Sequence, residues 1–239
     1  MQTILGAGGA IGRELAKSLR DYTTQVRLVS RNPQKVNEQD QLISADLMDS
    51  AAVLKATEGS EIVYLTAGLL YDTKIWRSMW PTIMKNVVDA CASHKAKMVF
   101  FDNIYMYPRD TVGRMTEENP IGPETKKGQV RAQIFRELME AVEQGRVEAL
   151  VARAADFYGP GILGVSVLTE SVFKPLSEGK KASILGGVDF VHSFTYTPDA
   201  GKATALLGNT PEAFGEVWHL PTAGNPWTMR QWTERFALE

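Results

Sequence analysis

The sequence contains little cysteine, little histidine and almost no net charge, and each shortage excludes a class of protein. Cys91 is the only cysteine among 239 residues, so an intramolecular disulfide is excluded and a reducing, cytoplasmic compartment is the simplest interpretation. The formal net charge is −2, which gives no bulk attraction to nucleic acid or to an anionic membrane. His94, His192 and His219 are widely spaced, so we expect no metal site.

Long hydrophobic runs are also missing. No segment approaches the roughly 20 apolar residues of a membrane-spanning helix, and the amino terminus lacks the basic start and cleavage site of a secretory signal. A Gly-x-Ser-x-Gly motif is absent, which argues against a hydrolase. We therefore expect a soluble protein that binds a small-molecule substrate, with no nucleic-acid or membrane partner, and we leave a homodimer open.

Short apolar runs alternate with helical patterns along most of the chain. Strands are expected at 3–5, 25–29, 41–44, 61–66, 97–101 and 147–153, and helices at 11–20, 50–57, 74–94 and 124–144. Such alternation predicts an α/β fold with a doubly wound parallel sheet. Ligands of such sheets bind at the carboxyl ends of the strands, so functional residues should follow each strand directly.

The first of these strand ends carries the motif GAGGAIG. Gly6 permits a tight turn, Gly8 lets the backbone approach a pyrophosphate, and Gly12 lets the following helix pack close to the strand. The helix amino terminus would then offer free N–H groups to the phosphates. The motif therefore predicts a dinucleotide site that includes Gly6, Gly8, Gly9, Ala10, Ile11 and Gly12.

The end of the second strand bears on which dinucleotide is bound. An NAD-specific site usually has an acidic residue there, but this chain has Ser30 and Arg31. A guanidinium can pair with a 2′-phosphate through two charge-assisted hydrogen bonds, so NADP(H) is favoured over NAD(H). In the alternative, Arg31 is a solvated loop residue and NAD(H) is also accepted.

Further motifs follow the later strands. They are Asp46-Leu47, Thr66-Ala67-Gly68, FFDNIYMYP (100–108), RAADFYGPG (153–161) and FTYTPDAGKA (194–203), with Asn86 on the long helix. In order and spacing these motifs resemble the short-chain dehydrogenase/reductase superfamily, in its extended or atypical NAD-dependent epimerase/dehydratase branch. The resemblance covers nearly the whole chain. It implies a Rossmann dinucleotide-binding core over 1–160 and a small substrate-binding lobe over 161–239, interleaved with the core.

The resemblance also assigns further site residues. It implies cofactor contacts at Asp46, Leu47, Thr66, Ala67, Gly68, Asn86, Ala154 and Phe157, and substrate contacts at Asp156, Tyr158 and His192. Each has an ordinary structural alternative, such as a turn, a surface polar group, a core aromatic or a loop histidine. After His192, we expect a helix capped by an acid such as Asp199. Another helix should begin near Thr228, and the chain ends within it, so the lobe is either naturally short or incomplete.

The catalytic groups of the resembled family are a Ser or Thr after the fifth strand and a Tyr-x-x-x-Lys pair on the next helix. Asn103 falls at the Ser/Thr position. In the basic stretch KKGQVR (126–131), Lys127 takes the Tyr position and Arg131 the Lys position. No tyrosine occurs between 107 and 158, so no shift of the alignment restores the pair.

This departure leaves the proton donor open. Lys127 could serve as an amine acid/base if Arg131 and desolvation depress its pKa, and Tyr105 is the alternative donor. Two functions of different class follow. One is an oxidoreductase or epimerase-like enzyme that acts on a small carbonyl or sugar-like substrate. The other is a dinucleotide-binding redox sensor or regulatory protein without turnover. The missing tyrosine favours this second function, whereas the aromatic and polar residues at 103–107 and 153–158 indicate a substrate pocket and favour the enzyme, which is our leading hypothesis.

Overall fold

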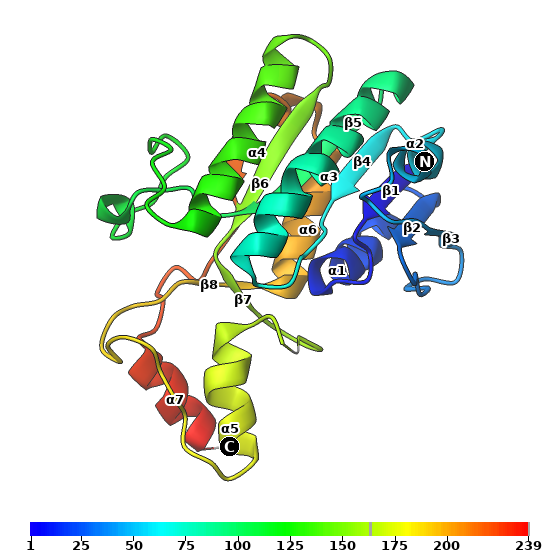
Figure 1. Cartoon of the computed structure of the whole chain (residues 1–239). Coiled ribbons are helices and arrows are strands. Elements are labelled where there is room, and N and C mark those ends of the chain that lie inside the picture. Colours follow the sequence, from blue (N-terminus) through cyan, green and yellow to red (C-terminus); the bar gives the residue numbers. More distant parts are fainter. Residues whose placement is uncertain (163, 239) are drawn as a thin grey trace.

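A parallel seven-stranded sheet forms the middle layer of the molecule (Figure 1). The computed structural model describes residues 1–162 and 164–238. Its strands are β1 (Gln2–Leu5), β2 (Val26–Ser30), β3 (Gln41–Ser44), β4 (Ile62–Leu65), β5 (Lys97–Asn103), β6 (Ala149–Ala154) and β9 (Val217–His219). Their order is β3-β2-β1-β4-β5-β6-β9, so the winding direction reverses between β1 and β4. This order is that of a doubly wound dinucleotide-binding sheet, which confirms the expected fold class.

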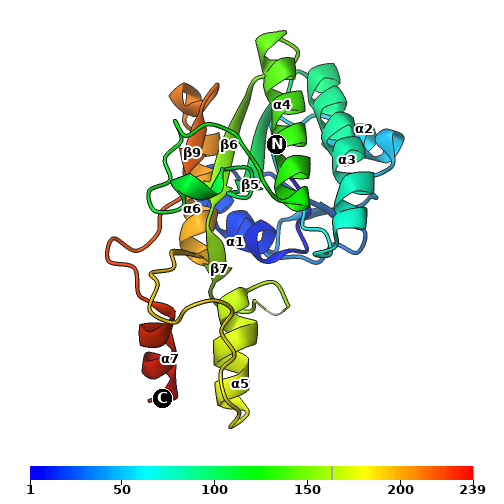
Figure 2. The same cartoon turned by 60° about the vertical axis from the view of Figure 1, so that its left-hand side comes forward.

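Helices cover both faces of the sheet (Figures 1 and 2). The helices α1 (Ala10–Ser18) and α6 (Thr197–Gly208) pack on one face, and α2 (Ser50–Thr57), α3 (Thr73–His94) and α4 (Lys126–Glu143) pack on the other. Consecutive strand residues such as Ile4 and Leu5 enter opposite hydrophobic clusters. Strands buried on both sides appear in the sequence as continuous apolar runs, which is why they could be predicted.

Side-chain caps fix where the helices on the second face begin. The carboxylate of Asp49 accepts from the first turn of α2, that of Asp72 from α3, and the hydroxyl of Thr125 from α4. Helix α1 differs, because its N-cap is Gly9 and no side chain caps it. Its first N–H groups therefore have no side-chain acceptor.

A small lobe lies at the carboxyl ends of the strands (Figure 1). It contains the two-stranded parallel sheet of β7 (Asp156–Tyr158) and β8 (Phe194–Tyr196), a π-helical turn at Thr169–Phe173, α5 (Lys174–Ser177) and α7 (Met229–Ala237). Short 3₁₀ turns occur at Leu19–Asp21, Arg109–Thr111 and Pro211–Ala213. Between the lobe segments, α6 and β9 return to the main sheet. The division of the chain at residue 160 stays a prediction, and its final residue, 239, lies outside the described residues.

The prediction that Asp199 caps α6 was wrong. The helix begins at Thr197 with Tyr196 as its N-cap, so Asp199 lies inside the first turn instead of before it. Pro198 stands in that first turn, where its fixed φ and missing N–H are tolerated and start the helix early. Asp199 still places a negative charge at the positive end of the helix dipole.

Candidate functional site at the carboxyl edge of the sheet

The glycine motif forms a tight turn between β1 and α1. Gly6 has φ +92°, and a Cβ there would overlap the backbone of Ala67. A Cβ on Gly12 would lie 2.7 Å from the Cα of Ala7. At Gly8, by contrast, the nearest atom to such a Cβ is the Ser30 hydroxyl at 3.8 Å. The fold therefore requires Gly6 and Gly12, whereas Gly8 faces space that a methyl group could occupy with only an ordinary van der Waals contact to Ser30.

This open space is bordered by unsatisfied donors. Helix α1 starts beside it with no capping side chain and no acidic residue in its first turn. The hydroxyl of Ser30 is buried and has no hydrogen-bond partner within the part of the chain that the structure describes. Uncapped N–H groups and a lone hydroxyl beside an open glycine suit a phosphate or ribose, so these residues fit a dinucleotide. Of the other predicted residues, Gly9 is the N-cap of α1, and Ala10 and Ile11 are its first two residues.

The loops after β2 and β3 contain the next predicted residues. Arg31 is exposed, and its carbonyl accepts from the Ser44 hydroxyl at 2.8 Å. Asp46 forms a turn in which its Oδ1 accepts from the Met48 backbone N–H at 3.0 Å. Asn86 is buried and donates from α3 to the Leu47 carbonyl at 3.0 Å, so it holds this loop from behind.

The residues after β4 lie against the glycine turn. Thr66 is buried and donates its hydroxyl to the Leu5 carbonyl at 3.2 Å. Ala67 closes the space beside Gly6, and Gly68 is exposed. The structure therefore brings the β1, β2, β3 and β4 ends together at one edge, as the parallel topology demands.

Arg131, predicted for the catalytic pair, lies in a buried ion pair. Its side chain is 3% exposed, and its Nε donates to Asp102 Oδ1 at 2.8 Å. Asp102 is fully buried, and Arg153 Nε lies 3.5 Å from its other oxygen. The Arg131 guanidinium also lies over the Trp80 ring, at 4.4 Å from the centroid. Its charge is thus satisfied inside the protein.

Lys127 has a different partner. Its ammonium donates to the carbonyl of Tyr71 at 2.9 Å and lies 3.1 Å from the centroid of the Tyr71 ring. Tyr71 belongs to the loop between β4 and α3. Lys127 therefore ties the start of α4 to that loop through a hydrogen bond and a cation–π contact.

Asn103 and Tyr105 form a turn at the end of β5. The Tyr105 backbone N–H donates to Asn103 Oδ1 at 3.0 Å, and the Tyr105 ring stacks on Trp76 with centroids 6.2 Å apart. Burial raises the pKa of Tyr105, and the negative charge of Asp156 adds to the increase. A Cβ at Gly128 would overlap the Tyr105 carbonyl oxygen, which explains the glycine within KKGQVR.

The predicted substrate residues gather in the lobe. His192 Nε2 lies 2.9 Å from Asp156 Oδ2, and the His192 ring stacks on Phe194 with centroids 4.3 Å apart. His192 and Tyr158 line a pocket of about 340 Å³. Ala154 is buried at the end of β6, and the half-buried Phe157 packs against Phe101 at 5.9 Å between centroids.

A polar network around Asp102, which joins strands β5, β6 and β9, was not predicted from the sequence. Arg153 Nη1 donates to the Tyr107 hydroxyl at 2.7 Å, and that hydroxyl lies 2.7 Å from His219 Nε2. Burial is the main cause that lowers the pKa of His219. Asp102 and Arg153 each stand within strands of apolar residues, and a charge in a strand expected to be fully buried is a signal for an ion pair.

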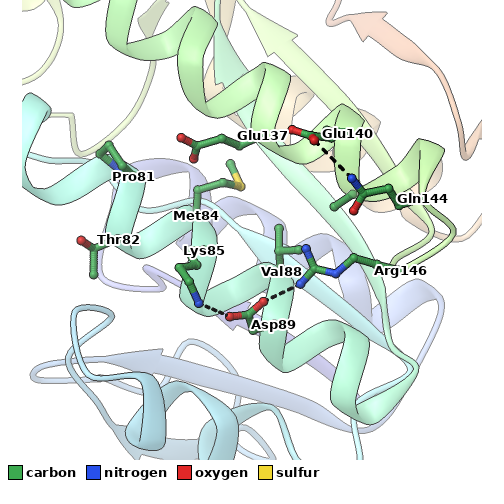
Figure 3. Close-up of a pocket in the computed structure, with 11 residues that line it drawn as sticks. Pro81, Thr82, Met84, Lys85, Val88, Asp89, Glu137, Glu140, Gln144 and Arg146 are labelled. Atoms are coloured by element: carbon green, nitrogen blue, oxygen red, sulfur yellow. Dashed lines mark hydrogen bonds and ion pairs between the residues drawn. The ribbon is translucent and has the colours of Figure 1, made fainter.

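A second hollow, of about 440 Å³, lies between the later turns of α3 and α4 (Figure 3). Its charged walls are paired with each other. Asp89 accepts from both Lys85 and Arg146 at 2.6 Å, and Glu140 accepts from Gln144 at 3.2 Å. No residue assigned to the cofactor or substrate lines this hollow.

Residues 1–162 and 164–238 contain neither a cluster of metal-ligating side chains nor a membrane-spanning helix. No group of three or more His, Cys, Asp or Glu side chains is arranged to hold a metal ion. None of the helices in that part of the chain is long and apolar enough to cross a membrane.

Strand order, glycine turn and uncapped α1 together define an α/β protein of the dinucleotide-binding class. The chain belongs to the NAD-dependent epimerase/dehydratase family, whose model matches residues 3–220. It therefore falls among the extended short-chain dehydrogenases/reductases, which are NAD(P)-dependent, as the sequence motifs indicated.

Two relatives of this chain are plant enzymes, and each aligns with only part of it. The chain is 25% identical over 185 residues to a 3β-hydroxysteroid-dehydrogenase/decarboxylase, isoform 2, and 31% identical over 133 residues to cinnamoyl-CoA reductase 2, both of Arabidopsis thaliana. These alignments cover 74% and 48% of this chain, but only 32% and 40% of the relatives. UDP-glucose 4-epimerase of Thermus thermophilus, solved with NAD, superimposes with a TM-score of 0.81 at 17% identity, over 100% of this chain and 83% of that one. At this low identity the superposition shows that the two proteins share a fold.

Proposed function

We propose that the protein binds NADP(H) and acts as an epimerase/dehydratase-like oxidoreductase on a small carbonyl or sugar-like substrate, without a Tyr-x-x-x-Lys pair. The observation that carries the proposal is the open space at Gly8, bordered by the uncapped α1 and the unpartnered Ser30 hydroxyl. Family membership supports the reaction class.

The preference for NADP(H) rests on Arg31. Its exposed side chain stands at the end of β2, next to Ser30, where it can reach a 2′-phosphate without leaving a buried partner unpaired. The Thermus thermophilus epimerase was solved with NAD. The proposed NADP(H) preference therefore comes from Arg31 of this chain and not from that structure. Asp46 is the nearest predicted acid, and its Oδ1 is already engaged by the Met48 N–H.

Several groups at the β5 end would serve the reaction. The nicotinamide, when bound, donates or accepts a hydride. The side-chain oxygen of Asn103 accepts the hydrogen bond of the Tyr105 N–H. Its NH₂ group therefore stays available to donate a hydrogen bond to a substrate oxygen. Tyr105 is the proton donor in this proposal. Burial raises its pKa, so the phenol is a weak acid that donates only to a strongly basic oxygen, such as the alkoxide of a reduced carbonyl. Lys127 and Arg131 would position the loop and strand around it.

A second function is favoured by a specific observation. Lys127 and Arg131 are both engaged by other groups of the protein, in a cation–π contact and a buried ion pair. The charge of Arg131 lowers the pKa of Tyr105, but burial and the negative charge of Asp156 outweigh it, so the net pKa is raised and not lowered as in a Tyr-x-x-x-Lys pair. A dinucleotide-binding sensor or regulatory protein without turnover would need the cofactor turn and no more.

Cofactor titration separates these functions. NADPH and NADH should be titrated by intrinsic tryptophan fluorescence, followed by a screen of aldehydes, ketones and nucleotide sugars for cofactor oxidation. Tight NADPH binding with turnover of one panel member supports the enzyme. Tight binding with no turnover across the panel supports the sensor, and failure to bind either nucleotide would contradict both.

A further inference from the structure

The pocket of about 340 Å³ in the lobe has walls that are mainly aromatic. Tyr158 and Phe194 come from β7 and β8, Trp227 precedes α7, and Trp232 lies within α7. The Trp227 and Trp232 rings lie 4.9 Å apart between centroids at 59°, and the Tyr158 and Trp232 rings lie 5.2 Å apart at 61°. Such edge and tilted arrangements leave ring faces that a further ring can meet.

Charge is nearly absent from these walls. No lysine, arginine, aspartate or glutamate lines the pocket among the residues that the structure describes. Asp156, which lies 2.9 Å from the wall residue His192, brings a negative charge to the pocket and no positive one. A phosphate-bearing substrate would lose hydration here without gaining a cation, whereas a neutral ring loses little.

Among the polar side chains of the pocket, which include Asn225, His192 is the one held in place by a contact with a charged residue. Its imidazole is held by Asp156 on one side and stacked on Phe194, so it has a fixed orientation. The side chain remains 40% exposed, which leaves it accessible to a ligand. A neutral site with one oriented hydrogen-bonding group matches the usual composition of a small-molecule pocket.

Asp156 connects this pocket to the β5 end. It begins β7, which follows directly after β6, and its carboxylate both contacts His192 and acts electrostatically on Tyr105. Asp156 therefore acts on groups of both sites, and a substrate that reacts at Asn103 and Tyr105 would have to pass it to place a ring in the pocket.

We propose that the lobe pocket binds an uncharged aromatic ring of the substrate, so that the protein acts on small aromatic carbonyl compounds and not on nucleotide sugars. The inference rests on the proposed function and narrows its substrate class. Trp227 and Trp232 form the ring-binding surface, and His192 contacts a polar group of the substrate.

Indole N–H resonances of the full chain provide the test. The five tryptophans are Trp76, Trp80, Trp218, Trp227 and Trp232. Each resonance is assigned by its Trp→Phe variant in ¹⁵N-labelled protein. Acetophenone, cyclohexyl methyl ketone and UDP-glucose are titrated as probes of an aromatic ketone, an aliphatic ketone of the same carbon frame and an anion. We expect acetophenone to shift the Trp227 and Trp232 resonances saturably, cyclohexyl methyl ketone to bind more weakly, and UDP-glucose to shift neither.

Two variants sharpen the result. Trp227→Ala removes a ring that is 39% exposed and should weaken acetophenone binding about fivefold, the value of roughly one aromatic contact. Trp218→Phe is the matched control, because Trp218 is 38% exposed on β9 and hydrogen-bonds Ala213 away from the lobe. Thermal melts of both variants verify folding. Unchanged acetophenone affinity in Trp227→Ala would contradict the proposal.

Other outcomes also decide the question. Equal affinity for the two ketones, or UDP-glucose shifting Trp227 and Trp232, would overturn the assignment of an aromatic ring. NADPH is titrated on the same samples. If NADPH binds and acetophenone does not, the pocket assignment fails while the proposed function stands; if acetophenone alone binds, the proposed function fails.

Discussion

The two halves of the carboxyl edge are built differently. Around the β1 and β2 ends, donors lack partners: α1 is uncapped, Ser30 is buried without a hydrogen bond among the described residues, and the space at Gly8 is open. Around the β5 end, the basic groups of KKGQVR are engaged, Arg131 by Asp102 and Lys127 by Tyr71. The donors there that lack a partner among the described residues, such as Arg153 Nη2 and Trp80 Nε1, are enclosed in the protein interior. The first half is organised to receive a ligand, whereas the second is organised to hold itself together.

The largest expected effect concerns the buried pair. Arg131→Met should lower the free energy of unfolding by about 3–5 kcal/mol, because it leaves Asp102 buried beside only the more distant Arg153. NADPH affinity should change little. Urea denaturation measures the loss. Arg136→Met, on the exposed face of the same helix, is the control and should stay within about 0.5 kcal/mol of wild type.

A substitution at Gly128, the glycine of KKGQVR, tests how closely α4 must pack against the loop after β5. Gly128→Ala places a methyl group against the Tyr105 carbonyl and Pro123. Overpacking should exceed the gain in helix propensity, for a net loss of about 1–2 kcal/mol in unfolding free energy. The exposed neighbour Gln129→Ala is the control. A Gly128→Ala protein as stable as wild type would show that the contact with the β5 loop is easily relaxed.

On the ligand-receiving side, Gly8→Ala should separate binding from stability. A methyl group there meets no protein atom closer than 3.8 Å, so the melting temperature should hold. The same group blocks the approach of a pyrophosphate, and NADPH affinity should fall about tenfold, or about 1.4 kcal/mol. Gly6→Ala is the contrasting variant, because its methyl group would overlap Ala67 and destabilise the fold.

Arg31→Ala should have a smaller and more selective effect. Loss of an exposed charge-assisted contact should weaken NADPH about fivefold and leave NADH unchanged. Raising the salt concentration should reduce the difference between wild type and variant. Equal affinity of wild type and variant for NADPH would remove the basis of the NADP(H) preference.

The smallest effect is the pH dependence of stability through His219. Burial is the main cause that lowers its pKa below the ordinary value of 6.5, so the folded state binds fewer protons than the unfolded state just below that pH. The unfolding free energy should therefore fall as the pH drops through this window. Urea denaturation of wild type and His219→Gln at about pH 7.5 and about pH 5.5 measures it. The variant should lose less, and an equal loss would assign the dependence to other groups.

The sequence predicted the core well because its strands are buried on both faces. Apolar runs such as 61–66 and 97–101 have no other common explanation, and helix-capping residues such as Asp72 mark the boundaries. The glycine motif could be recognised because its spacing is local.

Physical reasons explain why the short strands of the lobe and the partners of the basic residues could not be predicted. Strands β7 and β8 have three residues each, too few to show any periodicity. The ion pair of Asp102 and Arg131 joins residues 29 positions apart, and the contact of Lys127 with Tyr71 joins residues 56 apart. Such partners are set by the tertiary fold, so the sequence could assign Arg131 to the Lys position of the catalytic pair but could not identify Asp102 as its partner.

One side-by-side measurement tests the difference between the two halves most directly: NADPH affinity and melting temperature of Gly8→Ala and Arg131→Met. The structure predicts crossed outcomes. Gly8→Ala should lose affinity and keep its melting temperature, while Arg131→Met should lose melting temperature and, below its transition, keep its affinity. If Arg131→Met lost NADPH binding while folded, or Gly8→Ala kept it, the division into a ligand-receiving half and a self-supporting half would be contradicted.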